Sequence, residues 1–394
     1  MATQSRCTLL MAFLIIIAFS VTRVDNIVGF GVLRWLDTNS GSVTPVVRYG
    51  PKGHVVDIYV GTPPQRISAL LSSSSSVIWL QARNLFPFNP RESSTLNKLP
   101  CNHSLCKSFY KLKFGCRNTS TFSQRYEDGT SVSGKMASDI FHMGDTSYNL
   151  VFGYTTKSKR YWRSVQGVLG MGRGNTSLIR QVGASRFSVC LTTSKDEERV
   201  TPLILGDAAL LKPKLRNMAV RIPIVDNPSD PQHYYVALEG FSIGNRRVIL
   251  PPDAFQILPN RTAGVIFDMG SQLNMLDGKV LDIVWTYIAE DMKILPRDRN
   301  VFLGSKGFCA DKQLRSRWSD NPPSLTLHFL GGVDFTVPEQ NYVTEEGGTK
   351  CIAFVPSPIN GLSVFGNLFH QNMQVIYDLK NMTIMFAPAS CVHF

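Results

Sequence analysis

A motif that occurs twice, with the same internal spacing, constrains the fold of this 394-residue chain more than any other feature. In each copy an apolar run leads into a short polar turn, and an apolar pair followed by a glycine comes later in the chain. The glycine lies 98 positions after the first residue of the turn in both copies. The two copies are Ala69–Leu71 with Ser72–Ser75 and Val168–Gly170, and Val265–Phe267 with Asp268–Ser271 and Val364–Gly366. Such a duplication predicts two similar lobes related by pseudo-twofold symmetry, with a site between them.

The segments around these motifs are typical of a mainly β protein. Short alternating runs are bounded by Gly, Pro, Asn and Asp, as where Val55–Val60 precedes Gly61–Pro64, and this pattern favours strands. One amphipathic helix is expected, because apolar residues recur there at helical spacing. They are Val280, Ile283, Val284, Tyr287 and Ile288.

The amino-terminal region is typical of a secretory signal. Leu9–Phe19 is an apolar run of 11 residues that follows Arg6 and ends near Ala18 and Ser20, whereas a membrane-spanning helix needs about 20 residues. We therefore expect a secreted or vacuolar protein that has no membrane association once the signal is removed; an uncleaved signal anchor is the alternative. The expected organisation is a signal peptide (1–22), a short leader (23–52), a first lobe beginning near Gly53 (53–220), an irregular linker (221–232) and a second lobe (233–394).

The cysteines agree with an oxidising compartment. Seven of the eight lie beyond the signal, and none has the spacing of a metal site. They are Cys101, Cys106, Cys116, Cys190, Cys309, Cys351 and Cys391. Because seven is odd, at least one thiol is expected to be free or paired with another chain. No metal or cofactor is expected.

Acceptor sites for N-glycosylation support the same compartment, since they would be modified only in a secreted protein. The five Asn-x-Ser/Thr sites are Asn102, Asn118, Asn175, Asn260 and Asn381.

The charge balance is positive, with 41 Lys and Arg against 29 Asp and Glu. The basic residues are dispersed, and no basic stripe with interleaved aromatic residues occurs, so a nucleic-acid partner is not expected. A solvated basic surface is the favoured interpretation, and weak attraction to an acidic polymer stays open.

A series of further motifs in fixed order resembles the pepsin-like aspartic peptidases (peptidase A1), and within them the plant nepenthesin-like branch. The resemblance extends from about Gly53 to Cys391. The motifs are Val60–Gln65, Trp79, Tyr126–Thr130, Gly167–Arg173, Phe187–Leu191, Leu205–Ala209, Asp268–Ser271 and Pro323–Leu327. The resemblance implies a bilobal, pepsin-like double β-barrel with a cleft between the lobes. It also implies a reaction in which two carboxyl groups share a water, one accepting its proton and the other donating to the scissile carbonyl.

The second turn is nearly intact by this resemblance. Asp268 occupies the position of a catalytic carboxylate, Gly270 permits the tight turn, and Ser271 supplies a supporting hydroxyl. Met269 replaces a residue that is usually small and polar.

The first turn departs from the family. Ser72 stands where the resemblance implies the other catalytic Asp, Ser74 replaces the glycine, and only Ser75 fits as hydroxyl support. A serine hydroxyl cannot act as a general base near acidic or neutral pH. Since losing one member of a catalytic unit lowers turnover by about 10⁴ to 10⁶, efficient peptidase activity is not expected.

Two rescues of catalysis are not supported by the sequence. Asp57 lies on the strand that enters the first turn, outside the expected cleft. A serine nucleophile would need a nearby base and an oxyanion hole, and no Gly-x-Ser-x-Gly motif occurs. We expect the serine hydroxyls of this turn to bond one another and the backbone.

The resemblance also implies a flap and disulfides. Tyr126 matches the flap tyrosine, Gly129 the tip of its hairpin, and Trp79 a core anchor beneath it. The residues expected to bind substrate are Tyr126, Gly129, Gly270, Ser271 and Ser75. Cys309 with Cys351 and Cys190 with Cys391 match family disulfides. Cys101, Cys106 and Cys116 belong to a depleted cluster, which accounts for the odd count.

The leading hypothesis is a secreted, monomeric, catalytically impaired protein that binds a peptide or protein in the cleft. One alternative is a weak aspartic endopeptidase that relies on Asp268 and on a water held by Ser72. The other is an extracellular inhibitor of glycan-degrading enzymes, a role that the resemblance suggests because certain plant relatives with impaired dyads have it.

Overall fold

Two large β-sheets carry the two copies of the repeated motif. The computed structural model describes residues 36–37, 43–82, 88–105, 115–117, 119–126, 131–159, 165–258, 262–292, 303–304, 307–309, 322–346 and 349–394. All of them belong to one compact unit, Leu36–Phe394.

The first sheet has eleven strands among the described residues. In spatial order they are β14 (Val200–Pro202), β3 (Val46–Gly50), β4 (Gly53–Val60), β5 (Gln65–Ser72), β12 (Gly167–Gly170), β6 (Trp79–Leu80), β11 (Thr146–Lys159), β10 (Ser131–Met143), β9 (Thr119–Arg125) and β8 (Gly115–Arg117), and β7 (Asn97–Lys98) also pairs with β10.

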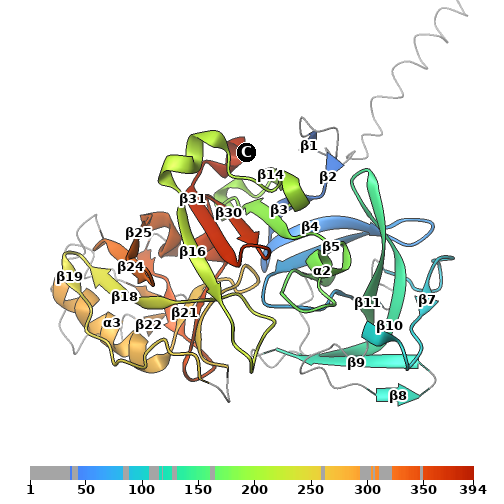
Figure 1. Ribbon diagram of the computed structural model, residues 1–394, viewed down its shortest axis with the longest axis horizontal. Helices are drawn as coiled ribbons and strands as arrows, with labels where there is room; N and C mark the ends of the chain where they lie inside the picture. Colours follow the sequence, from blue (N-terminus) through green and yellow to red (C-terminus); the bar gives the residue numbers. More distant parts are fainter. Residues whose placement is uncertain are drawn as a thin grey trace, which may run out of the picture. The chain divides into compact units, whose positions relative to one another are not determined.

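The second sheet has ten described strands. In spatial order they are β15 (Ile204–Leu205), β13 (Arg186–Cys190), β30 (Met373–Asp378), β31 (Thr383–Pro388), β16 (Val220–Val225), β17 (Tyr235–Val236), β20 (Gly264–Phe267), β29 (Leu362–Phe365), β21 (Asn274–Leu276) and β28 (Phe354–Pro356). Two of them, β13 and β15, come from the range expected for the first lobe (53–220), so this sheet joins the two lobes. Strands β30, β31 and β16 are adjacent in it (Figure 1).

Smaller sheets and helices complete the described part of the molecule. The sheets are β18 (Leu238–Ile243), β19 (Arg246–Arg247), β24 (Leu325–Phe329) and β25 (Val333–Val337); β22 (Leu303–Gly304), β23 (Gly307–Cys309), β26 (Val343–Glu346) and β27 (Thr349–Ile352); and β1 (Leu36–Asp37) with β2 (Val43–Thr44). The helices are α2 (Leu178–Gln181), α3 (Gly278–Asp291) and α5 (Asn367–His370), and the 3₁₀ turns are Ser194–Asp196, Gly206–Ala208, Pro213–Met218, Glu339–Asn341 and Cys391–His393.

The repeated motif folds in the same way in both halves. β5 runs parallel to β12, with Ser72 opposite Gly170, and β20 runs parallel to β29, with Phe267 opposite Phe365. A third short strand then pairs antiparallel with the second of these, β6 with β12 and β21 with β29. The predicted duplication and the mainly β, two-lobed fold are therefore confirmed.

Each copy ends in a glycine because the preceding turn leaves no room for a side chain. A Cβ on Gly170 would lie 2.6 Å from the Val77 carbonyl oxygen, and one on Gly366 would lie 2.2 Å from that of Leu273. In both halves this carbonyl belongs to the residue five positions after the turn begins.

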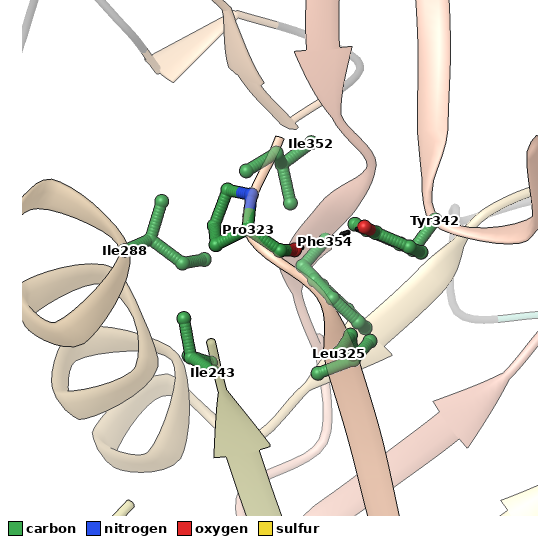
Figure 2. Close-up of a pocket in the computed structure, with 7 residues that line it drawn as sticks. All are labelled: Ile243, Ile288, Pro323, Leu325, Tyr342, Ile352 and Phe354. Atoms are coloured by element: carbon green, nitrogen blue, oxygen red, sulfur yellow. Dashed lines mark hydrogen bonds between the residues drawn. The ribbon is translucent and has the colours of Figure 1, made fainter. Parts of the chain in front are cut away.

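The predicted helix is confirmed as α3. Asp277 caps it by accepting a hydrogen bond from the Lys279 amide, and its buried face includes Val280, Val284 and Ile288. Where this helix packs against β18 and β28, Ile243, Ile288, Pro323, Leu325, Tyr342, Ile352 and Phe354 line a small apolar cavity (Figure 2). The cavity has room for about one water molecule, so it is a packing defect and not a ligand site.

Regular structure continues past two of the boundaries expected from the sequence. The regular fold begins before Gly53, because β3 lies between β14 and β4 with Val46 and Val47 buried. Its partner β14 is about 150 residues further along the chain, which local patterns cannot reveal. The expected linker is irregular only after Val225, since β16 pairs Ile222 with β31 and Ile224 with β17, and both residues are buried.

The Cys190–Cys391 disulfide is present, with a Cα separation of 5.3 Å. Cys351 is also disulfide-bonded, and the β23–β27 pairing sets Cys309 opposite it; the identity of its partner stays a prediction. Cys101 is disulfide-bonded as well, whereas the side chains of Cys106 and Cys116 lie outside the described residues.

Candidate functional site

The two repeated turns face each other, and the carboxylate of Asp268 lies at the centre of their contacts. Asp268 follows β20 directly and is 4% exposed. Its Oδ1 accepts hydrogen bonds from the Gly270 amide at 2.8 Å and from the Ser74 amide of the other turn at 3.1 Å. Its Oδ2 accepts one from the Ser271 hydroxyl at 2.8 Å. The second turn therefore holds a fully hydrogen-bonded carboxylate.

Ser72 occupies the corresponding position at the end of β5. Its hydroxyl lies 3.5 Å from Asp268 Oδ1 and 3.2 Å from the Ser74 hydroxyl. No imidazole is among the described contacts of Ser72, so a serine nucleophile with a histidine base is not supported. A Cβ on Gly270 would come within 2.6 Å of the Ser72 hydroxyl, so glycine at 270 keeps the two turns in close approach.

Ser73 joins the two turns directly. Its buried hydroxyl accepts a hydrogen bond from the Met269 amide at 3.0 Å and donates to the Phe267 carbonyl at 3.2 Å. The residue at the corresponding position of the second turn is Met269, which is buried and has no hydroxyl to return this contact. Because Met269 replaces a small polar residue, only the first turn provides a side-chain hydroxyl that bonds the backbone of the other turn.

The supporting hydroxyls also differ between the turns. Ser271 bonds the carboxylate of Asp268, whereas Ser75 bonds the main-chain carbonyl and amide of Val77. Ser76 caps the neighbouring Gly174 amide. The expectation that the serines bond one another and the backbone is confirmed. The substrate-binding role assigned to Ser75, Gly270 and Ser271 stays a prediction.

The expected flap is a hairpin of β9 and β10, with Arg125 paired to Ser131. Tyr126 follows β9, is half-buried, and its hydroxyl accepts a hydrogen bond of 2.6 Å from the indole nitrogen of Trp79. Trp79 is 1% exposed and belongs to the core cluster beneath. Gly129, the expected tip, lies outside the described residues.

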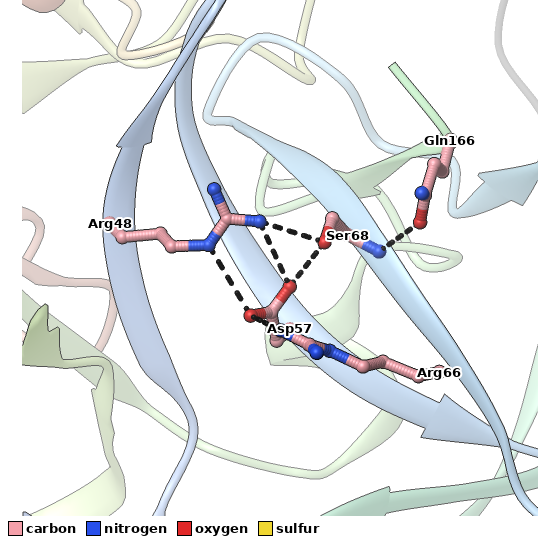
Figure 3. A network of polar contacts seen from close by, with 5 residues as sticks. All are labelled: Arg48, Asp57, Arg66, Ser68 and Gln166. Carbon is pink, nitrogen blue, oxygen red and sulfur yellow. Dashed lines mark hydrogen bonds and ion pairs between the residues drawn. The ribbon is translucent and has the colours of Figure 1, made fainter. Parts of the chain in front are cut away.

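Asp57 lies outside the paired turns, as the sequence predicts, and its carboxylate is bonded by other side chains. It lies on β4 and is 2% exposed. Arg48, Arg66 and the Ser68 hydroxyl bond its carboxylate, and Gln166 bonds the Ser68 amide (Figure 3). Burial raises the pKa of Asp57, but the bonds from Ser68 and Arg66 and the charge of Arg48 hold it below its ordinary value. This carboxylate fastens β3, β4 and β5 together.

No local sequence motif singles out the polar groups that lie behind the turns. His54, Asn367, His370 and Tyr377 are all buried there. Asn367 donates to the Met269 carbonyl at 3.1 Å, and His370 contacts the Tyr377 hydroxyl at 2.7 Å.

The glycosylation acceptors that the structure describes are exposed. They are Asn102, Asn175 and Asn381. Asn118 and Asn260 lie outside the described residues.

Within the described residues, no group of three or more His, Cys, Asp or Glu side chains could hold a metal ion. No helix in that part of the chain is long and apolar enough to cross a membrane.

Comparisons with known proteins agree with this geometry. A family profile described as "Xylanase inhibitor N-terminal" matches residues 54–207, and one described as "Xylanase inhibitor C-terminal" matches residues 233–388. The solved structure of conglutin gamma, a basic 7S globulin from lupine seeds, superimposes with a TM-score of 0.69. It has 18% sequence identity and covers 88% of this chain and 95% of that one, so it supports the fold.

Curated relatives are more similar in sequence. The aspartic proteinase nepenthesin-1 of Nepenthes gracilis is 30% identical over 371 residues, which are 90% of this chain and 82% of the relative. Nepenthesin-2 of the same plant is 29% identical over 369 residues, with the same coverage. Together with the duplicated turns around Ser72 and Asp268, these matches show that the chain belongs to the pepsin-like aspartic protease family, in its xylanase-inhibitor-like and nepenthesin-like plant branch.

Proposed function

We propose that this chain is a secreted, pepsin-fold protein that has lost peptidase activity and binds a peptide or protein partner between its lobes. One observation carries the proposal: the position that mirrors Asp268 is occupied by Ser72, whose hydroxyl lies 3.5 Å from that carboxylate. The scaffold around both positions is retained, including the paired strands, the Ser73 bridge and the Trp79–Tyr126 hydrogen bond.

The chemical reason is that peptide hydrolysis by this family uses two carboxyl groups in different protonation states. A like charge nearby separates their pKa values, so one carboxyl group can donate a proton while the other accepts one. A serine hydroxyl beside Asp268 cannot take either state in that range. A water between Ser72 and Asp268 would thus have one general base and no matched general acid.

A secreted location is part of the same proposal. It is supported by the signal-like segment Leu9–Phe19, by the Cys190–Cys391 disulfide and by the exposure of Asn102, Asn175 and Asn381.

The test is hydrolysis of an unfolded protein by the purified mature chain across pH 4 to 7, with folding followed in parallel. We expect no cleavage by the native chain. We expect Ser72→Asp combined with Ser74→Gly to raise cleavage by about 10³-fold or more, since the missing member of the catalytic unit returns. Cleavage by the native chain that is abolished both by Asp268→Ala and by a transition-state-mimicking peptide inhibitor would overturn the proposal in favour of a weak endopeptidase.

A second candidate, inhibition of a glycan-degrading enzyme, is favoured by the xylanase-inhibitor profiles that match both halves of the chain. The test is to titrate a panel of xylanases with the purified protein at pH 5 to 7. A stoichiometric loss of xylanase activity, to the same extent with the Asp268→Ala variant as with the native chain, would support inhibition as the function. Full xylanase activity at protein concentrations well above that of the enzyme would reject it.

A further inference from the structure

Two histidines lie behind the paired turns, and both are completely buried. His54 is on β4 in the first half of the chain, and His370 is in α5 in the second half; each is 0% exposed. Neither belongs to the turns that carry Ser72 and Asp268. Each nevertheless bonds a group that supports these turns.

His54 bonds Asn367 across the two halves. Its Nδ1 lies 2.8 Å from the Asn367 Nδ2 and 3.1 Å from Oδ1. The same Nδ2 donates to the main-chain carbonyl of Met269 at 3.1 Å. Because a carbonyl can only accept, it fixes the orientation of the amide, so His54 Nδ1 must accept the remaining N–H. A protonated His54 would have to donate to Asn367 Oδ1 instead, which lies 3.1 Å away and already accepts a hydrogen bond from Gln371 Nε2 at 3.0 Å.

His370 also uses its neutral form. Its Nδ1 lies 2.6 Å from the Gly366 carbonyl, to which it must donate, and its Nε2 lies 2.7 Å from the Tyr377 hydroxyl. Nε2 is therefore the acceptor of the ring. The side chain of Ser73, the residue that joins the two turns, also contacts the buried Tyr377 hydroxyl.

Burial lowers the pKa of each ring to about 4, because no water solvates the charged form. Hydrogen bonds to Asn367 and to the Gly366 carbonyl favour the charged forms but do not offset burial. Among the described residues, the titratable groups that face the rings are Tyr49, which stacks edge-on with His54, and Tyr377 and Asp268 beside His370. The charge of Asp268 favours a protonated His370, whereas a charge on His370 disfavours one on His54.

We propose that His54 and His370 form an acid-sensitive tie between the two halves, which is intact while both rings are neutral and is released when they are protonated. Release removes the support of the Met269 carbonyl through Asn367 and that of Ser73 through Tyr377. The device therefore acts on the geometry of the Ser72 and Asp268 turns without including either residue.

The direction of the pH dependence follows from the pKa values. An unfolded histidine titrates near 6.5 and these two near 4, so between these values the unfolded state binds more protons. Stability is then full above about pH 7 and is lost as the pH falls toward 4. Two such groups make the unfolding equilibrium constant rise by up to about 100-fold for each unit of pH lost.

The test compares urea unfolding between pH 7 and 4.5 for the native chain and for the double variant His54→Asn, His370→Gln. Asn places a hydrogen-bonding atom near the position of Nδ1, Gln places one near the position of Nε2, and neither amide can be protonated. We expect the native chain to take up about two more protons on unfolding at pH 5.5 than the double variant. The exposed His393→Gln is the matched control, because it should leave this difference unchanged.

A second measurement decides the matter even if the double variant does not fold. In the native chain labelled with ¹⁵N-histidine, we expect two rings that stay neutral at pH 5.5, one protonated at Nε2 and the other at Nδ1. Amides of α5 should exchange with solvent faster, relative to their intrinsic rates, at pH 4.5 than at pH 7. Equal proton uptake by native chain and variant, or titration of all seven histidines near pH 6.5, would overturn the proposal.

Discussion

The two turns share one backbone and differ in their polar side chains. In the second half, Asp268 gathers the Gly270 amide and the Ser271 hydroxyl around a single carboxylate. In the first half, the hydroxyl of Ser72 makes only long contacts, and Ser75 bonds the backbone. The two turns therefore keep the same strand geometry although only one of them holds a carboxylate.

The largest effect should come from the glycines that both halves require. Gly366→Ala and Gly170→Ala would each set a Cβ against main-chain carbonyl oxygens, at 2.2 Å and 2.6 Å. We expect each to lower the free energy of unfolding by about 4 kcal/mol, because the clash is with main-chain atoms, with Gly366 the more sensitive. Urea unfolding at pH 7 measures this.

The control for these variants is Gly278→Ala at the start of α3, where no atom lies within 4 Å of an added Cβ. It should be neutral or stabilise by up to about 1 kcal/mol. Similar losses at all three glycines would show that the two turns have no special requirement for close approach.

A smaller and asymmetric effect is expected at the first residue of each turn. Asp268→Ala leaves the Gly270 amide, the Ser74 amide and the Ser271 hydroxyl without their acceptor, at a cost of about 3 kcal/mol in unfolding free energy. Ser72→Ala removes contacts of only 3.2 and 3.5 Å and should cost less than about 1 kcal/mol. Equal losses at pH 7 would mean that Ser72 has taken over the structural role of a carboxylate.

The smallest difference concerns the supporting hydroxyls. Ser271→Ala removes a hydrogen bond to a charged acceptor and should cost about 1.5 to 2 kcal/mol, whereas Ser75→Ala removes neutral bonds to Val77 and should cost about 0.5 to 1 kcal/mol. Thermal and urea unfolding of the two variants, prepared in parallel, would resolve this. A larger loss at Ser75 would contradict the assignment of its hydroxyl to the backbone.

The proposed histidine tie affects how the activity assays must be read. Members of this family hydrolyse peptides with a carboxyl group that is protonated, a chemistry favoured by acid. Here, two buried neutral imidazoles make the fold less stable over that same range. An absence of cleavage at pH 4 is therefore informative only if the chain is shown to be folded at that pH. The assays at pH 5 to 6 distinguish a folded, inactive protein from an unfolded one.

Much of the fold and part of the site could be predicted from residues near one another in sequence. The spacing from Ser72 to Gly170 and from Asp268 to Gly366 revealed the duplication, because both copies use the same strand–turn geometry. The helix at Gly278–Asp291 followed from its apolar period. The position of β3 could not be predicted from the local sequence, since Val46 and Val47 are buried partly by β14, a strand far along the chain.

By itself, the sequence determined that the chain has two equivalent turns and that only the second keeps a carboxylate. These properties are local, depending on residue type and spacing. Tertiary structure alone decided that the Ser75 hydroxyl bonds Val77, that Ser73 bridges to Met269, and that His54 meets Asn367, 313 residues away. The physical reason is that a buried polar group bonds whichever partner the packing brings within about 3 Å, and that partner leaves no pattern in the surrounding sequence.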